Sequence, residues 1–405
     1  MCIRDRDSLT QITLGAACGE LVLGKKIGNR AMLWGAVGGT IPDLDILANG
    51  FLTDVEALAF HRGISHSLFF AITTPFLFAY LTHQFYERGW YQQKGFKWIN
   101  SFFWLGLLML LNFIPVMISG NISNRMVGIT TVLGLLIFYR LWNNYLHTPL
   151  ESITATYKDW TKLFFWSIFT HPLLDAFTAY GTQLFAPFSD YRVAFNTISV
   201  ADPIYTFPFI AFLVAAMMLH RTKKWRLYLT LMGILWSSAY LLFTVFNKQR
   251  IDTVFEKALA TQNIQYQRFR TSPTIFNNIL WQGVAEAEDV YYLGIYSLFD
   301  TKPTVSFYPL NKDHELIEKY ESNKDIQTLK WFSDGYYSIM KLPDGKVQLS
   351  DVRYGSIREG SFKPEDFVFR FIIDPAAEDL NIKEIRGREN VGNAFAELFD
   401  RIKGR

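Results

Sequence analysis

The feature that most constrains this chain is a series of apolar runs, each close to the length that crosses a lipid bilayer. A transmembrane helix needs about 20 mostly apolar residues. Such runs, with few charges, are spaced through the first 246 of the 405 residues. They predict membrane-spanning helices over residues 67–86, 101–119, 126–142, 161–180, 203–219 and 227–246.

Charge divides the chain into two parts. Residues 1–246 hold 18 Lys/Arg and 13 Asp/Glu, whereas the shorter stretch 247–405 holds 22 and 24. We therefore expect a polytopic membrane domain over residues 7–246 and a water-soluble domain over residues 247–405. The first six residues look like a translated cloning or assembly remnant, with the natural start near Asp7. A net charge of +3 without a basic motif gives no indication of nucleic-acid binding.

The first apolar stretch is broken. Residues 9–24 are apolar and rich in small residues, with Gly15 and Gly19 at a spacing that allows close helix packing in a membrane. A second short run stops at Pro42, because proline ends or kinks a helix. Residues 9–45 are therefore expected to form a short, re-entrant helical hairpin. Altogether we expect about six to eight helical segments.

The C-terminal part changes character. Residues 248–270 read as an amphipathic or linking helix, and aromatic-rich alternating runs follow it. Pro343-Asp-Gly345 is a turn signal between two of these runs. The sequence predicts a small β-rich α+β domain, with strands over residues 290–298, 304–308, 336–340, 346–349 and 367–373.

Basic loops set the expected orientation. Residues 220–226, residues 88–97 and the turn around Lys25 carry the positive charge that favours the cytoplasmic side. Counting spans between these loops places the polar motifs of the membrane domain on the outer side. The last span runs outward, so we expect a multi-pass protein of the bacterial inner membrane whose C-terminal domain is extracytoplasmic.

Six carboxylate and imidazole side chains interrupt this apolar sequence. Charged groups at membrane depth are costly, so they usually have a partner or a function. Carboxylate and imidazole are the ligand types that hold zinc, manganese or iron. We predict one metal site from residues far apart in the sequence: Asp43, Asp45, His61, His66, His171 and Asp175.

Local spacing refines this prediction. His171 and Asp175 are four residues apart, which places both on one helix face, although Pro172 suggests that the helix begins or kinks there. An extended turn around Leu44 would direct Asp43 and Asp45 to the same side.

Two further residues form a second tier. Arg62 is expected either to hold a phosphate or carboxylate or to pair with an aspartate. Asp202 borders an apolar segment. For any one of these polar residues alone, a helix cap or a hydrogen-bonded anchor remains the simpler explanation.

The chemistry best suited to such a site is hydrolysis. A bound divalent ion, with zinc as the first candidate, lowers the pKa of its water to about 7. Asp45 or Asp175 would then act as general base. A site near the outer membrane–water boundary favours a lipid-like or other small substrate, such as a phosphoester.

Two other readings stay open. One is a non-catalytic scaffold or regulatory protein, with a structural metal or polar network and a protein partner for the C-terminal domain. The other is a transporter, which broken helices with intramembrane acids would fit; no paired repeat halves are seen, so it ranks last.

Taken together, the motifs resemble the YdjM-like family of bacterial inner-membrane metal-dependent hydrolases. The resemblance covers about residues 7–246 and rests on an ordered set of motifs. It implies that the Asp, His and His-x-x-x-Asp residues are metal ligands. Some relatives carry Thr-His where this chain has Thr10 and Gln11, so one histidine ligand is replaced here. The matching segments are residues 7–15, 39–45, 61–67, 171–178, 180–183, 187–189 and 202–205.

Overall fold

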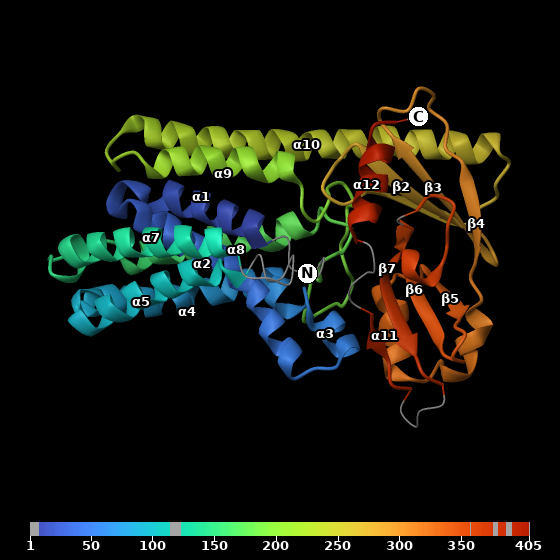
Figure 1. Cartoon of the computed structure of the whole chain (residues 1–405), viewed down its shortest axis with the longest axis horizontal. Helices are drawn as coiled ribbons and strands as arrows, with labels where there is room; N and C mark the ends of the chain where they lie inside the picture. The colour runs from blue at the N-terminus through green and yellow to red at the C-terminus, as the bar shows by residue number, and fades with distance from the viewer. Residues whose placement is uncertain (1–7, 114–122, 357, 376–379, 386–390, 405) are drawn as a thin grey trace. The chain divides into compact units, whose positions relative to one another are not determined.

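The computed structural model describes residues 8–113, 123–356, 358–375, 380–385 and 391–404. The suspected remnant at residues 1–6 and the end of the predicted span 101–119 lie outside these ranges. The chain divides into two compact units, one of residues 76–161 and one of residues 1–75 with 162–405. A helical region is followed by two small antiparallel sheets, which confirms the predicted fold class (Figure 1).

The predicted N-terminal helical hairpin is present, and its re-entrant course in a membrane stays a prediction. Helices α1 (Ser8–Ile27) and α2 (Asn29–Thr40) are joined through Gly28, whose φ of 62° suits glycine. Their backbones are in direct contact, because a Cβ on Gly15 would meet the Gly35 carbonyl and one on Gly39 would meet the Gln11 carbonyl. Glycine at the crossing is what permits this close approach.

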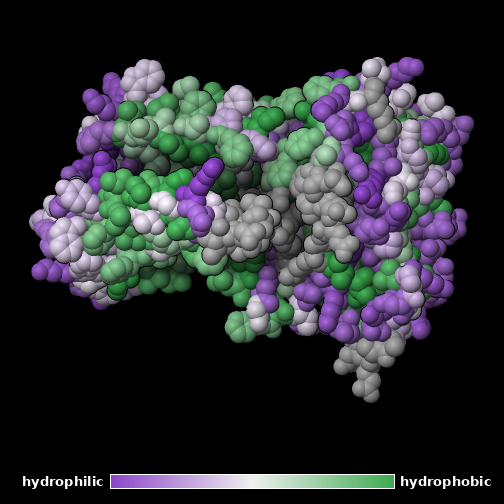
Figure 2. All heavy atoms as spheres, viewed as in Figure 1, coloured by the Kyte–Doolittle hydropathy of each residue, from purple (hydrophilic) through white to green (hydrophobic). Residues whose placement is uncertain are grey.

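Most predicted spans coincide with helices. Among the described residues, three helices are long and apolar enough to cross a membrane: α4, α7 with its extension to residue 146, and α10. Hydrophobic side chains colour much of the visible helical surface in Figure 2. The helices are α3 (Asp54–Phe60), α4 (Leu68–Glu87), α5 (Lys94–Leu110), α7 (Asn124–Leu141), α8 (Tyr157–Asp175), α9 (Pro203–Met217) and α10 (Lys224–Thr261).

Shorter helical turns join these elements. The predicted helix over residues 161–180 ends at Asp175, and residues 176–201 follow as irregular chain with two isolated β-bridges.

Within the unit of residues 76–161, the Tyr86 and Trp160 rings stack 5.3 Å apart. The short elements are η2 (Pro42–Gly50), η3 (Ile64–His66), η4 (Trp90–Gln92) and the π-helical η5 (Trp142–Leu146).

Helix α10 is longer than predicted. The last apolar run and the expected linking helix form one uninterrupted element of 38 residues (Figure 1). Its final turns bury Ile251 and Phe255 against Trp281 of the first sheet. The linking segment therefore ends at Thr261 and not at residue 270.

Two four-stranded antiparallel sheets make up most of the remaining chain. The predicted strands over residues 290–298, 336–340, 346–349 and 367–373 are confirmed, and the one over 304–308 lies at 307–311. Pro343–Gly345 forms the turn of the β5–β6 hairpin. The first sheet is β1 (Arg268–Pro273), β2 (Leu280–Glu286), β3 (Val290–Ser297) and β4 (Phe307–Asn311); the second is β5 (Tyr337–Lys341), β6 (Val347–Ser356), β7 (Phe367–Ile373) and β8 (Lys383–Glu384).

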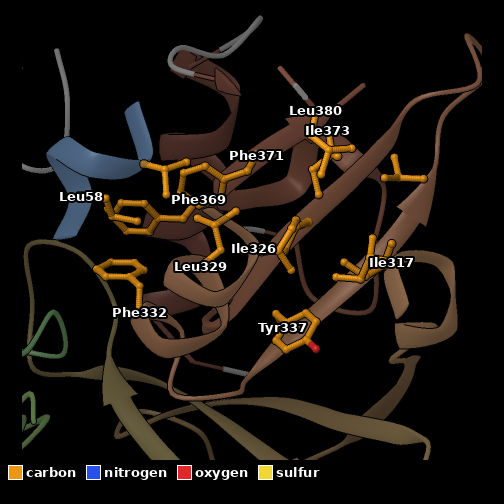
Figure 3. Close-up of a cluster of buried hydrophobic side chains, with 14 of the residues drawn as sticks. Leu58, Ile317, Ile326, Leu329, Phe332, Tyr337, Phe369, Phe371, Ile373 and Leu380 are labelled. Carbon is orange, nitrogen blue, oxygen red and sulfur yellow. The ribbon is translucent and has the colours of Figure 1, made fainter. Parts of the chain in front are cut away.

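The second sheet packs on α11 (Lys324–Phe332) and reaches back to the N-terminal half of the chain. Phe332 and Phe369 lie beside Leu58 of α3 in one buried cluster (Figure 3). Tyr180 belongs to the same cluster. The C-terminal region thus covers the segment that carries the histidine motif. The other helical elements there are η6 (His314–Tyr320), η7 (Pro364–Asp366) and α12 (Val391–Ile402).

Candidate metal centre

Four side chains from three separate segments converge on one point. Asp43 comes from η2, His66 from η3, and His171 and Asp175 from the last turns of α8. Nε2 of His66 is 3.4 Å from Oδ1 of Asp43 and 3.4 Å from Oδ2 of Asp175. Nε2 of His171 is 3.4 Å and 3.3 Å from the same two oxygens. Three of these residues, Asp43, His66 and His171, form a group able to hold a metal ion.

These distances fit ligands better than hydrogen-bond partners. Charge-assisted N–H···O bonds are usually about 2.7–2.9 Å long. Two ligands bound to one ion at about 2.0–2.1 Å lie roughly 2.8–3.4 Å apart at ordinary bond angles. Moreover, Nε2 of His171 and Oδ2 of Asp175 are buried and have no hydrogen-bond partner among the described residues. The donor set therefore fits a divalent ion.

A backbone carbonyl fixes the His171 ring. Its Nδ1 donates a hydrogen bond of 2.6 Å to the Gly39 carbonyl oxygen. This leaves the lone pair of Nε2 directed at the centre, as a metal-ligating histidine requires. Helix α8 continues through Pro172 as far as Asp175, so the expectation that it begins there was wrong. Spacing of four residues brings His171 and Asp175 to one face, as predicted.

Asp45 is placed differently from Asp43. Residues 42–50 form a 3₁₀ helix and not the extended turn that was expected. Asp45 accepts hydrogen bonds from His61 Nδ1 at 3.0 Å and Ser65 Oγ at 3.1 Å. Ser65 Oγ in turn is 3.0 Å from Nδ1 of His66. The structure thus sets Asp45 behind His66, where it orients the ring, and His61 behind Asp45.

The charges around Asp45 keep it ionised. Burial would raise the pKa of the Asp45 carboxyl, but its hydrogen bond with His61 and the nearby imidazoles outweigh burial and lower it. Burial lowers the pKa of His61 despite Asp45, which favours the neutral ring. For Asp43, burial is again opposed by His171 and His66, and its pKa lies far below the usual range.

Arg62 pairs with an aspartate, one of the two roles expected for it. Its guanidinium lies 3.3 Å from Oδ1 of Asp175 and donates to Thr178 Oγ1 at 2.8 Å. Gln11 Nε2 donates to the same Asp175 oxygen at 2.9 Å. One carboxylate oxygen of Asp175 is thereby held by Arg62 and Gln11, and the other faces the two histidines.

Asp202 caps the N-terminus of α9. Its Oδ1 accepts from the backbone N–H groups of Ile204 and Tyr205, and Tyr240 donates to its Oδ2 at 2.8 Å. Burial raises the pKa of this carboxyl against these hydrogen bonds. Asp202 shares a cavity with Asp175 and Gln11.

An aromatic side chain connects the centre to the C-terminal region. The Tyr180 ring lies 5.5 Å from His61 and 5.2 Å from Phe332 of α11. Arg62 and Arg192 lie over this ring at 5.1 Å and 4.9 Å. His66 and His171 are fully buried, whereas the Asp43 side chain keeps 18% of its exposure. Among the four converging side chains, Asp43 offers the most open approach.

Sequence reasoning missed several residues around the centre. Gln11 was noted only as a departure from relatives, yet it holds Asp175. Ser65 was not among the predicted site residues, yet it links His66 to Asp45. The Gly39 carbonyl carries no side-chain signal; the only hint was the run of small residues that brings α2 against α1.

Comparison with known proteins identifies the helical part of the chain. The model of the family described as YdjM inner membrane protein matches residues 7–114 and 123–251, which is more than half of the chain. No curated protein and no solved structure matches it. With its long apolar helices, this is a membrane protein, and the chain belongs to the YdjM inner membrane protein family.

Proposed function

We propose that this membrane protein is a metal-dependent hydrolase that acts at the outer membrane–water boundary. The observation that carries the proposal is the convergence of two imidazole nitrogens and two carboxylate oxygens at 3.3–3.4 Å. Asp43, His66, His171 and Asp175 would hold the ion. The mixed nitrogen and oxygen donors favour zinc, with manganese or iron as alternatives.

The chain's own residues have distinct roles in this proposal. A bound divalent ion supplies Lewis acidity and lowers the pKa of a coordinated water to about 7. Asp45, through Ser65, orients His66, and the Gly39 carbonyl orients His171. Asp175 and Asp45 remain the two candidates for general base. The base has to be a carboxylate that does not ligate the ion. Asp175 meets this condition where Asp43, His66 and His171 alone hold the ion, whereas the hydrogen bonds of Asp45 all point to His61, Ser65 and the Arg62 backbone.

The expected substrate is lipid-like or a small phosphoester. Two arginines lie close to the centre: Arg62 on Asp175, and Arg192, which donates to the His61 carbonyl oxygen at 3.4 Å. Positive charge beside a metal centre suits an anionic substrate group. The position of the basic loops supports a multi-pass topology with the centre and the C-terminal domain, residues 247–405, outside the cytoplasm.

The second candidate is a scaffold or regulatory protein with a structural metal. The cover that α11 and the second sheet provide over Leu58 and Tyr180 favours it, because the C-terminal domain could serve as a platform for a protein partner. An open coordination position would distinguish the hydrolase from a closed structural site.

Metal content tests the proposal first. Detergent-purified protein, prepared without chelator, is expected to carry about one transition-metal ion per chain by elemental mass spectrometry. His66→Ala and His171→Ala should both lose it. His83→Ala, a half-exposed histidine that pairs with Glu87, is the matched control and should retain it.

Activity is the second step. Metal-loaded wild type and His171→Ala are compared on a chromogenic phosphodiester and on phospholipid vesicles. Hydrolysis that disappears in His171→Ala and after chelation supports the enzyme. Wild-type protein that binds metal and releases no product from either substrate would favour the scaffold with a structural metal. Wild type without metal would contradict the hydrolase and leave the scaffold with a polar network.

A further inference from the structure

A small cavity adjoins the metal centre and differs from it chemically. Its polar lining comes from α1, α8, α9 and the segment before α9, and all of it is buried. No nitrogen ligand of the histidine type lines it; the polar atoms are hydroxyl, amide and carboxylate groups. The polar lining residues are Thr10, Gln11, Asp175, Thr178, Ser199, Asp202, Tyr205 and Thr206.

One wall of this cavity has an acceptor without a donor. Gln11 is 2% exposed, and its Nε2 donates to Asp175 and to the His171 carbonyl. These two bonds fix which end of the amide is nitrogen. Its Oε1 is buried and has no hydrogen-bond partner among the described residues. A buried amide oxygen of this kind normally has a partner, so a donor or a cation is expected there.

Another wall has a carboxylate without a cation. Asp202 is 3% exposed, and its described contacts are two backbone N–H groups and the Tyr240 hydroxyl. No Lys, Arg or His among the described residues forms an ion pair with it. The α9 N-terminus offsets part of its charge. One lone pair of Oδ2 remains after the bond from Tyr240.

Two hydroxyls complete the lining. Thr10 Oγ1 and Thr206 Oγ1 lie 2.7 Å apart, so one donates to the other and both oxygens retain lone pairs. Helix α8 also ends beside the cavity, at Asp175. The C-terminal end of a helix carries partial negative charge and favours a cation.

We propose that this cavity binds a monovalent cation, with Na⁺ as the best fit. Oxygen-only donors select hard cations, whereas the imidazoles of the neighbouring centre select transition metals. One carboxylate without a cationic partner matches a single positive charge. Gln11 Oε1, Asp202 and the threonine hydroxyls would be the ligands. The proposal does not depend on hydrolysis. Its ligands are different from the four converging side chains, although Asp175 borders both sites.

Thermal unfolding of the full-length protein in detergent tests the proposal. NaCl is exchanged for choline chloride at constant ionic strength, because choline is too large for the cavity. Wild-type Tm is expected to rise by about 3 °C or more in Na⁺, since a ligand that binds only the folded state stabilises it. Equal Tm values in the two salts would mean that the cavity holds only water and would overturn the proposal. A larger rise with Mg²⁺ than with Na⁺ would overturn the monovalent assignment.

Asp202→Asn is the first variant, because asparagine preserves the helix cap and removes the charge. It should lose the Na⁺-dependent shift. Thr206→Val is the second, in case the first does not fold, and should reduce the shift at least twofold. The matched control is Thr13→Val, whose hydroxyl donates within α1 to the Leu9 carbonyl oxygen. A full shift in Asp202→Asn or Thr206→Val would contradict the proposal.

Transition-metal content is measured on the same samples. It should be unchanged in Thr206→Val and Thr13→Val, because neither residue belongs to the histidine centre. A protein without transition metal but with the Na⁺ shift would reject the proposed hydrolase and leave the cation site standing. The reverse result would reject only the cation site.

Discussion

Two buried polar clusters lie along α1, and they differ in how completely their hydrogen bonds are made. Near one end, Arg226 donates to both oxygens of Glu20 at 2.6 and 2.5 Å, and its remaining nitrogen donates to Asn29 Oδ1 and the Leu219 carbonyl oxygen. Near the other end, the polar atoms of the metal centre face one another at 3.3–3.4 Å, and two of them lack hydrogen-bond partners.

This difference distinguishes buried polar residues that stabilise the fold from buried polar residues that can bind a ligand. Both clusters are almost fully buried, so burial alone does not distinguish them. The Glu20–Arg226 pair neutralises its own charge, and four of the five N–H groups of the guanidinium donate to protein acceptors, which leaves little for a ligand. The side chains of the metal centre neither neutralise their own charge nor satisfy all of their hydrogen-bonding atoms, and a bound cation would do both.

The largest effect on stability is expected in the Glu20–Arg226 cluster. Arg226→Met removes the cation and leaves Glu20 buried, so we expect a loss of about 3–5 kcal/mol in the free energy of unfolding. Denaturant unfolding in detergent measures it. Lys224→Met, at an exposed position of the same helix, is the control and should stay near wild type. Zinc should still raise the Tm of Arg226→Met, because the centre is separate.

The pair can also be replaced as a whole. Glu20→Leu combined with Arg226→Met should recover most of the lost stability, since no charge is left unpaired. A loss below about 1 kcal/mol in Arg226→Met would contradict the structural role assigned to the pair.

Substitutions at two glycines of the α1–α2 hairpin allow a direct comparison of the two clusters. A Cβ on Gly19 would meet Ala31, and one on Gly39 would meet the Gln11 backbone, so alanine at either position should cost about 1–3 kcal/mol. Only Gly39 presents its carbonyl to His171. Gly39→Ala should therefore also weaken zinc affinity, and Gly19→Ala should not. Competition titration with a chelating dye measures this, and equal affinities would remove the Gly39 carbonyl from the description of the centre.

A third change addresses the carboxylate behind the ligands. Asp45→Asn preserves shape but weakens the orientation of His66 and His61, and we expect a 10–100-fold loss of zinc affinity. The stability of the metal-free protein should change much less. An affinity loss far above this range, with no metal retained, would instead make Asp45 a direct ligand.

The smallest effect on stability is expected at the edge of the Glu20–Arg226 cluster. Asn29 is exposed and accepts one hydrogen bond from Arg226 at 2.7 Å. Asn29→Ala should cost about 0.5–1.5 kcal/mol, because water can take over this bond. A cost as large as that of Arg226→Met would show that the pair depends on Asn29, and zinc affinity should be unchanged in either case.

The sequence predicted those features that follow from the chemistry of a residue and its neighbours along the chain. Apolar length predicted most helices, and ligand chemistry selected the residues that converge, although His66 and His171 are more than 100 positions apart. The boundary between domains at residues 246 and 247, the orientation and the metal ligation itself stay predictions. Asp43 and Asp45 illustrate the limit: two carboxylates separated by one residue have different partners because the backbone between them is a 3₁₀ helix.

Other misses have similar causes. Strands β1 and β2 went unpredicted because polar residues such as Gln282 are buried in them by pairing with the neighbouring sheet. The continuity of α10 was missed because hydrophobicity stops near residue 246 although the helix does not. Pro172 was expected to begin or kink a helix. It does not begin one, because it lies inside α8, one turn before its end, and a kink there stays a prediction.

The uninterrupted course of α10 has a mechanical consequence. A helix of 38 residues is about 57 Å long, roughly twice the thickness of a bilayer's hydrocarbon core. Its last turns pack against the first sheet, so the helix joins the apolar turns to the β strands without a flexible break. Helices tilt when bilayer thickness changes. A tilt of about 10° would displace the far end of a rod of this length by about 10 Å, and the packed last turns of α10 would pass that displacement to the first sheet.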